Sequence, residues 1–405
     1  MEIVCGVEQV NRHPLTPYSE VVCDFLDTYS KALRGDAEAK AYPDVMTFAF
    51  WTRRGNIGKK KEEFLSSNNG KKRVGRGVIF HISPSNVPVN CMFTYAFGLL
   101  AGNSNVVRIP TKNFPQIDCM LRIIEEVLKE EAFSVIKEMT SFVKYDRTEI
   151  KYSEQLSSAC DVRVIWGGDD TINSIRQALL PPRSTEITFA DRYSFGIVSV
   201  DAIMKMSDDQ LNNIANGFYN DTYLMDQNAC STPHLICFRK DGLSLKDVEN
   251  ARLRFWNSIF CVAKKYSLDD IKVSDKYTDL CDIVMSSDNA PLFDGNIIKN
   301  VKEYDNLLYV CELSTLPSDT VYRCRGRYGM FFEYEFDKYE ELNILSDTKV
   351  QTCAVCGVDN NELRDFIIDQ GWCGIDRIVP FGSTLDIDVI WDGYDIISSL
   401  SRVIY

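Results

Sequence analysis

The sequence predicts an α/β protein built on parallel strands, and two observations lead to this prediction. Short runs rich in β-branched and aromatic residues, beginning with VIFHI (78–82), alternate with stretches of helical periodicity. Turn-forming segments such as SPSNVP (83–88) separate them. Strand, helix and strand in that order are typical of a parallel sheet, and 405 residues are enough for two domains.

Helices are expected before this alternating pattern. Residues 1–66 form a predicted helical lead-in, because FLDTYSKALRG (25–35) and FAFWTRRG (48–55) carry apolar residues at helical spacing. A basic segment follows at 58–73. Such a charge run is usually a solvated surface; the alternative is a landing site for a phosphorylated or acidic thioester carrier.

The alternating region begins at Gly75. Its apolar stretch 89–102 is too short to cross a bilayer, which takes about 20 apolar residues, so a buried helix is expected there. The segment 114–130 has apolar residues on one helical face. The strands expected in this region are 78–82, 106–110 and 161–166, and the helices are 89–101, 114–130 and 171–180.

The pattern starts again from residue 201. A helix is expected near Ser207, a residue type that favours the N-cap. The apolar stretch HLICF (234–238) and a helix over about 244–265 follow. Short strands are expected around GRYGMFFEYEF (326–336), and the tail 377–402 has a mixed pattern.

The composition argues against two classes of function. The net charge of −13 disfavours nucleic-acid binding, which depends on clustered lysine and arginine. The N-terminus has no basic start followed by an apolar stretch, so neither a signal peptide nor a membrane span is expected. We expect a cytoplasmic protein.

Fourteen cysteines are scattered along the chain without a disulfide-type spacing, and we expect reduced thiols, most of them buried. Cys353 and Cys356 form a CxxC pair that could belong to a zinc site. No second pair follows at ligand spacing, and the chain has three histidines. Two ordinary thiols are the better interpretation, and no metal is expected.

The segment WGGDDT (166–171) lies between a predicted strand and a predicted helix. Gly167 and Gly168 would allow a phosphate to approach the helix N-terminus, which favours negative charge. Alternatively, Asp169 and Asp170 simply cap the helix. Gly75 and Gly77 precede a strand and do not match the dinucleotide fingerprint. WGGDDT is therefore the remaining candidate for a phosphate-binding segment.

Several long segments resemble a known family. In order and spacing, the chain is similar to the aldehyde dehydrogenase superfamily, and more closely to the LuxC family of acyl-CoA and acyl-protein thioester reductases. The segments that carry this resemblance are YPDVMTFAFWTRR (42–54), FHISPSNVP (80–88), GLLAGNSNVVRIP (98–110), YNDTYLMDQNACS (219–231), RGRYGMFFEYE (325–335) and GIDRIVPFGSTLDIDVIWDGYD (374–395).

The resemblance implies an aldehyde dehydrogenase-like fold with a Rossmann-like nucleotide domain and an α/β catalytic domain. The nucleotide domain is expected over 1–198, including the helical lead-in, and the catalytic domain over 199–370. The segment 371–405 would pack back on the nucleotide domain or form an oligomer interface. A homo-oligomer is expected.

The resemblance also implies the catalytic residues. Cys230 matches the family's nucleophile, and a thiolate attacks a thioester carbonyl readily because a thiol is also the leaving group. Its backbone N–H and the amide of Asn86 would stabilise the developing oxyanion. The alternatives are a buried core thiol for Cys230 and a turn amide held between two prolines for Asn86.

Two departures from the superfamily pattern bear on the reaction. The position of the general-base glutamate of hydrolytic members falls on Phe189, so water is not easily activated against an acyl-cysteine. That favours reduction of a thioester to an aldehyde over oxidation to an acid. The glutamate that contacts the nicotinamide ribose is also missing, since Gly326 falls near its position.

The resemblance implies a nicotinamide dinucleotide as cofactor. Many NAD-using members have a glutamate where this chain has Thr111, and loss of that carboxylate next to Lys112 and Arg108 favours NADPH, with NADH as the alternative. Ordinary surface charges are the competing interpretation. The residues expected to contact the dinucleotide are Ser83, Pro84, Arg108, Thr111, Lys112, Gly167 and Gly168.

We therefore expect NADPH-dependent reduction of a fatty acyl thioester, carried by coenzyme A or a protein, to the aldehyde. A hydrolytic aldehyde dehydrogenase and a catalytically silent scaffold are the alternatives. A partner of the acyl-protein synthetase type is expected to supply the acyl group. His234 could tune the Cys230 thiol or be structural, and His81 is expected to be a packed strand residue.

Overall fold

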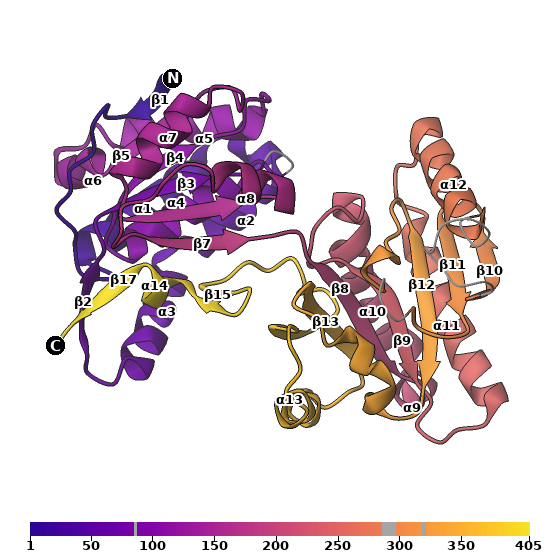
Figure 1. Cartoon of the computed structure of the whole chain (residues 1–405). Coiled ribbons are helices and arrows are strands. Elements are labelled where there is room, and N and C mark those ends of the chain that lie inside the picture. The colour runs from indigo at the N-terminus through magenta and orange to yellow at the C-terminus, as the bar shows by residue number, and fades with distance from the viewer. Residues whose placement is uncertain (85–86, 286–296, 318–320) are drawn as a thin grey trace. The chain divides into compact units, whose positions relative to one another are not determined.

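A computed structural model of the chain describes residues 1–84, 87–285, 297–317 and 321–405. The chain divides into two compact units (Figure 1): Met1–Asp191 with Tyr394–Tyr405, and Arg192–Gly393. This division differs from the expected ranges at both ends of the second unit. Strand β8 (Tyr193–Ser199) pairs with strands of the second unit, and residues 371–393 also belong there.

The first unit contains a six-stranded sheet in the order β1-β5-β4-β3-β6-β7. Strand β1 is antiparallel to β5, and the other neighbours are parallel. The parallel arrangement follows from the helical crossovers that join successive strands. The strands are β1 (Glu2–Gly6), β3 (Val78–Ile82), β4 (Ser104–Arg108), β5 (Thr140–Lys144), β6 (Val162–Trp166) and β7 (Thr185–Phe189).

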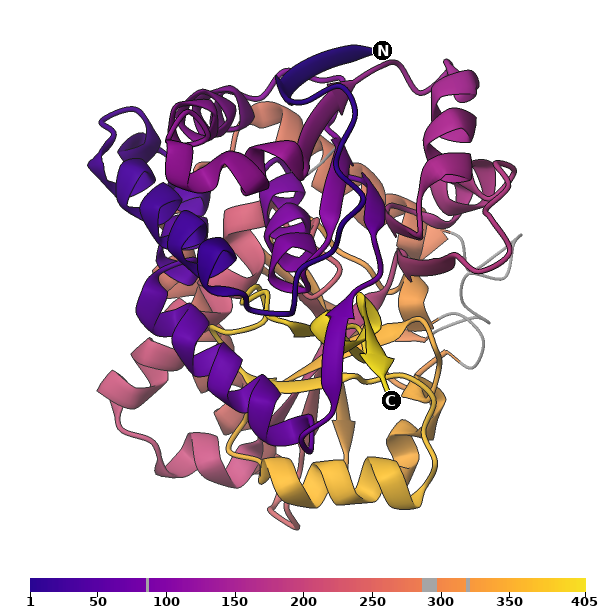
Figure 2. The same ribbon diagram turned by 90° about the vertical axis from the view of Figure 1, so that its left-hand side faces the viewer.

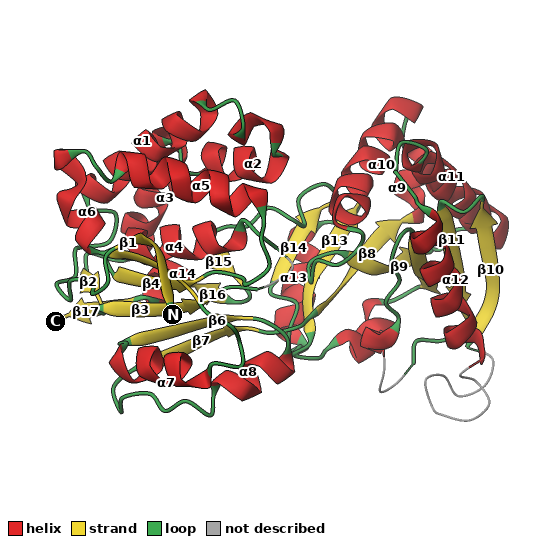
Figure 3. Cartoon of the chain, turned by 90° about the horizontal axis from the view of Figure 1, so that it is seen from above, coloured by secondary structure: helices red, strands yellow, loops and turns green. Residues whose placement is uncertain are grey.

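Helices cover both faces of this sheet, with α1, α4 and α5 on one side and α7 and α8 on the other (Figure 3). Every residue of α4 is buried, as expected for the apolar stretch. Helix α5 begins at Pro115, where the missing N–H costs nothing. The helices are α1 (Glu20–Gly35), α2 (Pro43–Trp51), α3 (Arg54–Ser67), α4 (Asn90–Leu100), α5 (Pro115–Val127), α6 (Ser134–Glu138), α7 (Ile150–Ala159) and α8 (Asp169–Ile175), with short 3-10 turns η1 (Ala39–Ala41) and η2 (Glu131–Phe133).

The C-terminal strand β17 (Ser401–Ile404) returns to the first unit, where it pairs antiparallel with β2 (Lys72–Gly75) (Figure 2). The Asn103 amide donates to the Leu400 carbonyl at 2.9 Å. These contacts fasten the chain end to the turn before β4. The other short elements here are β16 (Tyr394–Asp395) and α14 (Ile396–Ser399), whereas β15 (Ile390–Trp391) belongs to the second unit.

The second unit contains a seven-stranded sheet in the order β10-β11-β12-β9-β8-β13-β14. Strand β10 is antiparallel to β11, and the remaining neighbours are parallel. Strands β8 and β13 are buried along their whole length. The strands are β9 (Pro233–Arg239), β10 (Ile298–Tyr304), β11 (Leu308–Leu313), β12 (Met330–Phe336), β13 (Val350–Cys356) and β14 (Arg377–Pro380), besides β8.

Two apolar cores lie on opposite faces of this second sheet, one under α9, α10 and α11 and the other under α12 and α13 (Figure 3). Ser207 caps α10 in a capping box with Gln210, and Ser244 caps α11, so the cap predicted at Ser207 is correct. The helices are α9 (Val200–Lys205), α10 (Asp208–Thr222), α11 (Leu245–Ala263), α12 (Asp270–Met285) and α13 (Asn360–Asp369), with 3-10 turns η3 (Tyr223–Met225), η4 (Val321–Arg323) and η5 (Tyr339–Leu345).

A buried ionic network joins α11 to strands β11 and β12. Arg252 is 5% exposed and pairs with Glu333, Glu335 and, at 3.2 Å, Glu312. Trp256 also donates its indole N–H to Glu333 at 2.7 Å. One guanidinium therefore balances several carboxylates in the interior of the second unit.

The α/β fold with parallel sheets predicted from the sequence is confirmed. Several element ends differ from the expected ones: β4 stops at Arg108 rather than at residue 110, α5 at Val127 rather than at residue 130, and α8 at Ile175 rather than at residue 180. The helical lead-in expected over 1–66 is wrong at its start, because Glu2–Gly6 form strand β1, which pairs with β5. Among the helices of the described ranges, none combines the length and apolar character needed to cross a membrane.

Candidate active site

Cys230 lies in the turn between η3 and β9 and is partly exposed. Ten of the fourteen cysteines are buried, which leaves Cys230, Cys261, Cys281 and Cys373 with accessible surface. The buried-core interpretation therefore does not apply to Cys230. Ser194, on β8, donates its hydroxyl to the Cys230 carbonyl at 2.7 Å and holds the turn against the sheet.

Asp221 supports the same turn from the end of α10. Its backbone carbonyl accepts from the Thr232 hydroxyl at 2.8 Å. Its carboxylate accepts from the N–H groups of Gly382 at 2.6 Å and Thr384 at 3.0 Å. Burial raises the pKa of Asp221 from 3.8 to about 6, against the opposing effect of these two donors. Asp221 thus connects the cysteine turn to the loop after β14.

Replacing Asp221 by asparagine is expected to change how stability depends on pH. Since the folded pKa is raised from 3.8 to about 6, the folded protein keeps a proton that the unfolded chain releases. In the unchanged protein, the contribution of Asp221 to the free energy of unfolding should therefore fall as pH rises from about 4 to about 6, by on the order of 3 kcal/mol at most. The Asp221→Asn protein should lack this fall. Urea unfolding of both proteins across this range measures it, and parallel curves would contradict the assignment.

His234 follows the turn on β9 and is 3% exposed. Burial, with a smaller contribution from Arg325, lowers the pKa of His234 to about 3. Its ring stacks on Tyr193 with centroids 5.8 Å apart. A neutral imidazole cannot favour a thiolate through positive charge, so a structural role fits His234 better. His81 is fully buried between Thr94 and Asn105, as expected for a packed strand residue.

Asn86 lies outside the described residues. Ser83 and Pro84 precede it, directly after β3, and both are partly buried. The backbone N–H of Ser83 donates to the carbonyl of Arg108 at 3.3 Å. Ser83 and Arg108, both expected to contact the dinucleotide, therefore lie together at the carboxyl edge of the first sheet. Trp166, at the end of neighbouring β6, precedes Gly167 at the same edge.

Two polar atoms at this edge have no hydrogen-bond partner among the described residues. They are the Ser83 hydroxyl oxygen and Arg108 Nε, both buried. The guanidinium of Arg108 also lies 4.7 Å from the centre of the Tyr145 ring. A buried polar atom normally has a partner, so this edge fits a polar ligand.

The other expected contacts lie in different surroundings. Thr111 and Lys112 are exposed, and Lys112 Nζ is 5.2 Å from the centre of the Phe114 ring. A Cβ at Gly168 would meet no atom within 4 Å, so packing does not require glycine there. Asp169 and Asp170 lie in the first turn of α8, where negative charge is favoured, but the N-cap residue is Gly168, so neither aspartate caps the helix as expected. A phosphate role for Gly167 and Gly168 stays a prediction.

The two departures from the superfamily pattern have structural counterparts. Phe189 is 5% exposed and stacks on Trp166 with centroids 3.7 Å apart. A Cβ at Gly326 would lie 1.8 Å from the Met330 carbonyl oxygen, so no side chain fits there. Neither position provides a carboxylate.

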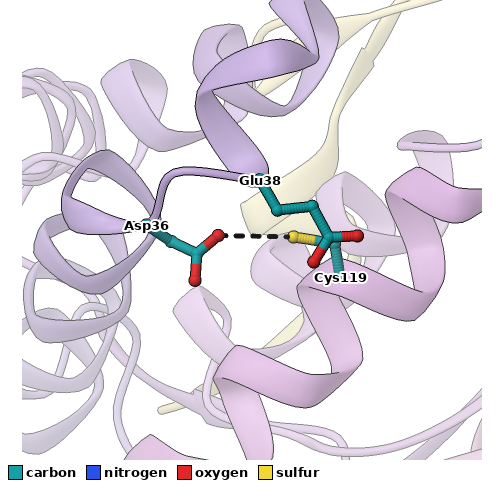
Figure 4. A group of neighbouring side chains, drawn as sticks. All are labelled: Asp36, Glu38 and Cys119. Atoms are coloured by element: carbon teal, nitrogen blue, oxygen red, sulfur yellow. Dashed lines mark hydrogen bonds between the residues drawn. The ribbon is translucent and has the colours of Figure 1, made fainter.

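Asp36, Glu38 and Cys119 bring oxygen and sulfur atoms within 4.8 Å of one another in the first unit (Figure 4). Arg122 Nη2 donates to both carboxylates at 3.0 Å, so an internal cation already balances them. Burial raises the pKa of the Cys119 thiol, which disfavours the ligating thiolate. The cluster is described best as an ion-pair group.

The CxxC pair occupies β13. Cys353 belongs to the core on one face of the second sheet and Cys356 to the core on the other. Burial raises the pKa of Cys356 to about 12. Thiols on opposite faces of a strand cannot share one ion, so the core-thiol interpretation fits this pair.

Solved structures with a similar fold include a bifunctional proline utilization A protein (15% identity, TM-score 0.62), of which the chain covers 39% with 93% of its own length. A NAD-dependent benzaldehyde dehydrogenase from Corynebacterium glutamicum (14%, TM-score 0.59) is covered over 85%, with 96% of this chain. A salicylaldehyde dehydrogenase from Pseudomonas putida G7 (12%, TM-score 0.61) is also covered over 85%, with 96% of this chain.

These likenesses define the fold as that of the aldehyde dehydrogenases. The chain spans about two fifths of the proline utilization A protein. Residues 60–257 match the family model described as acyl-CoA reductase (LuxC). These residues, which include Cys230, are similar to the LuxC family, and the resemblance stated from the sequence is confirmed over this range. No curated protein matches the chain.

Sequence reasoning did not identify Asp221, Ser194 or Gln227 as supports of the cysteine turn. Gln227 lies in the segment that carried the family resemblance, but its neighbours gave no sign of its partners, Gly329 and Met330. Ser194 lies between two aromatic residues and Asp221 between two polar ones, and neither surrounding indicates a partner. Such residues become visible only when the folded chain brings their partners near.

Proposed function

We propose that this protein reduces a fatty acyl thioester, carried by coenzyme A or by a protein, to the aldehyde with NADPH. The observation that carries the proposal is the partly exposed Cys230 in a turn held by Ser194, within the range that matches the acyl-CoA reductase family. The family match supports the reaction class, and the residues of this chain support the individual steps.

Cys230 Sγ, as the thiolate, attacks the thioester carbonyl, and the donor thiolate leaves, so that the acyl group becomes bound to the enzyme. The Cys230 N–H and the Asn86 amide are proposed to stabilise the oxyanion. A reduced nicotinamide dinucleotide, when bound, would supply the hydride that reduces the acyl carbon on Cys230. The resulting thiohemiacetal anion on Cys230 then expels the sulfur, which releases the aldehyde and restores the thiolate.

The residue at the general-base position of the superfamily supports reduction over hydrolysis. Phe189, at the general-base position of the superfamily, is buried in an aromatic stack with Trp166. An acyl-cysteine without a nearby base persists longer in the presence of water. We therefore propose reduction of the acyl-cysteine rather than its hydrolysis.

The first unit is proposed to hold the dinucleotide at the carboxyl edge of its sheet. Parallel sheets commonly bind nucleotides there. The unpartnered Ser83 hydroxyl would donate a hydrogen bond to it or accept one from it, and Arg108 Nε would donate one to it. Thr111 and Lys112 are exposed, and a cation without a neighbouring carboxylate at 111 favours a 2′-phosphate, which is the basis for preferring NADPH to NADH.

Acylation and reduction can be tested separately. The protein is mixed with acyl-CoAs of several chain lengths without cofactor, and peptide mass spectrometry determines which cysteine carries the acyl group. NADPH or NADH is then added, and absorbance at 340 nm follows its oxidation. We expect an acyl adduct on Cys230, and we expect NADPH to be oxidised faster than NADH.

The other outcomes identify the alternatives. Acylation without cofactor oxidation would indicate acyl transfer, and an absence of acylation would favour the scaffold. Formation of carboxylic acid from an aldehyde with oxidised cofactor would support the hydrolytic dehydrogenase. Any of these results contradicts the proposed reductase.

We also propose an acyl-protein synthetase partner and a homo-oligomer. The basic segment 58–73 is a candidate contact, although Lys59 and Lys61 pair with Glu63 and Glu20 within the first unit. Lys71 and Lys72 are exposed. Co-purification tests the partner, and light scattering after size-exclusion chromatography tests the oligomer.

A further inference from the structure

Two consecutive residues before Cys230 have left-handed backbone. The φ angles are 52° for Asp226 and 62° for Gln227, and neither residue is glycine. Such conformations persist when surrounding contacts determine them, and they cluster at functional sites. Gln227 is also 3% exposed, so its polar side chain must find partners inside the protein.

The Gln227 side chain uses both ends of its amide on one backbone segment. Its Oε1 accepts from the Gly329 N–H at 2.6 Å, and its Nε2 donates to the Met330 carbonyl at 2.9 Å. Its own backbone N–H donates to the Thr222 carbonyl at 2.9 Å. Because every partner is main chain, the position of Gln227 is tied to the backbone before and at the start of β12.

That backbone segment is itself fixed from the other side. A Cβ at Gly329 would lie 2.2 Å from the Leu307 carbonyl oxygen. The carbonyl of Gly329 accepts from the Tyr309 N–H at 2.8 Å. Lys276, fully buried on α12, donates to the Tyr328 carbonyl at 3.0 Å. Gln227 therefore connects the short turn before Cys230 to a backbone segment that is fixed by its own contacts.

We propose that Gln227 is a positioning residue that sets the geometry of the Cys230 turn by joining it to the 328–330 backbone. This rests on the proposed function for its catalytic consequence. Gln227 does not touch the reacting atoms; it acts along the backbone, where only Asn228 and Ala229 separate it from Cys230. A shift of about 1 Å in such a turn can cost about 100-fold in rate.

The need for an amide gives the proposal a specific signature. In Gln227→Glu, an ionised carboxylate can accept from Gly329 but is repelled by the Met330 carbonyl. A protonated carboxyl group can accept and donate as the amide does. Burial favours the protonated form, so the variant should recover as pH falls.

Other titrating groups pack around this turn and must be separated from position 227. Asp226 pairs with Lys272, and Arg327 pairs with Asp279. Burial lowers the pKa of Lys276 to about 8 and raises that of Asp221 to about 6. Each variant is therefore compared with the unchanged protein at the same pH, from about 5 to about 7.5, where Lys276 keeps its proton.

The first measurement is the rate at which iodoacetamide alkylates Cys230, followed by mass spectrometry, which does not depend on any reductase activity. The second is kcat and KM with acyl-CoA and NADPH. We expect Gln227→Glu to lose about 10-fold to 100-fold in both alkylation rate and kcat near pH 7.5, with KM changed less than about twofold. Most of the loss should disappear near pH 5.

Gln227→Asn is the second variant, because asparagine tolerates left-handed backbone but is one methylene shorter. It should show the same loss without recovery in acid. Asn228→Ala, at an exposed position in the same turn, is the matched control and should behave like the unchanged protein.

Two results would overturn the proposal. One is a Gln227→Glu protein whose alkylation and kcat equal those of the unchanged protein at every pH. The other is a loss that merely follows the fraction unfolded, measured by circular dichroism, with no acid recovery. If alkylation responds as expected but no form of the protein oxidises NADPH, the positioning role stands and the proposed reductase function fails.

Discussion

Replacing Cys230 by alanine will remove both acyl-enzyme formation and thioester-dependent NADPH oxidation. The expected fall in kcat is roughly 10⁴-fold or more, the scale found when an enzyme loses its covalent nucleophile. The reason is that Cys230 is the proposed nucleophile, and the neighbouring hydroxyls of Ser231 and Thr232 belong to buried residues. Absorbance at 340 nm and intact-protein mass spectrometry measure the two effects.

The controls for this prediction are Cys261→Ala and Cys373→Ala, since both of these thiols are exposed. They should retain the activity of the unchanged protein, because exposure alone does not make a thiol catalytic. An undiminished rate in the Cys230→Ala protein, or an acyl group found on Cys261 instead, would contradict the assignment.

Replacing Arg252 by methionine will lower the free energy of unfolding by about 3–5 kcal/mol, the range for removing one partner of a buried ion pair. The change leaves Glu333, 1% exposed, and two further carboxylates without their internal cation. Because the network lies between α11 and β12, the second unit should unfold more readily. Urea denaturation followed by circular dichroism measures the loss.

Two further variants test this interpretation of Arg252. Lys246→Ala, at an exposed position of the same helix, should change stability by less than about 0.5 kcal/mol. Combining Arg252→Met with Glu333→Gln should recover part of the loss, since one buried charge is removed. A single Arg252→Met variant as stable as the unchanged protein would show that the network contributes little.

Local chemistry explains which parts of the fold could be predicted. Ser207 begins its helix because its hydroxyl satisfies a nearby backbone N–H, and both partners are neighbours in the sequence. The wholly apolar segment of α4 likewise indicates burial without further information. The sheet to which strand β8 belongs could not be predicted, because a wholly buried strand has no sequence pattern that indicates its neighbours.

The candidate site could be predicted in part for a related reason. Cys230 was found through a family resemblance in its surrounding segment. Asp221 and Gln227 bind backbone groups 161 and 103 positions away, respectively, and such pairings have no local signal. The pKa of His234 was also unpredictable, since it depends on burial and on Arg325.

The closed packing at Gly326 limits where contacts to the proposed cofactor can change. A Cβ there would lie 1.8 Å from the Met330 carbonyl oxygen, so a carboxylate cannot be introduced at this position by a single exchange. Thr111 and Lys112 are on the surface, where exchanges usually alter stability by no more than about 0.5 kcal/mol. If these two residues contact the dinucleotide as proposed, exchanges at them should alter the choice between NADPH and NADH while the cysteine turn stays intact.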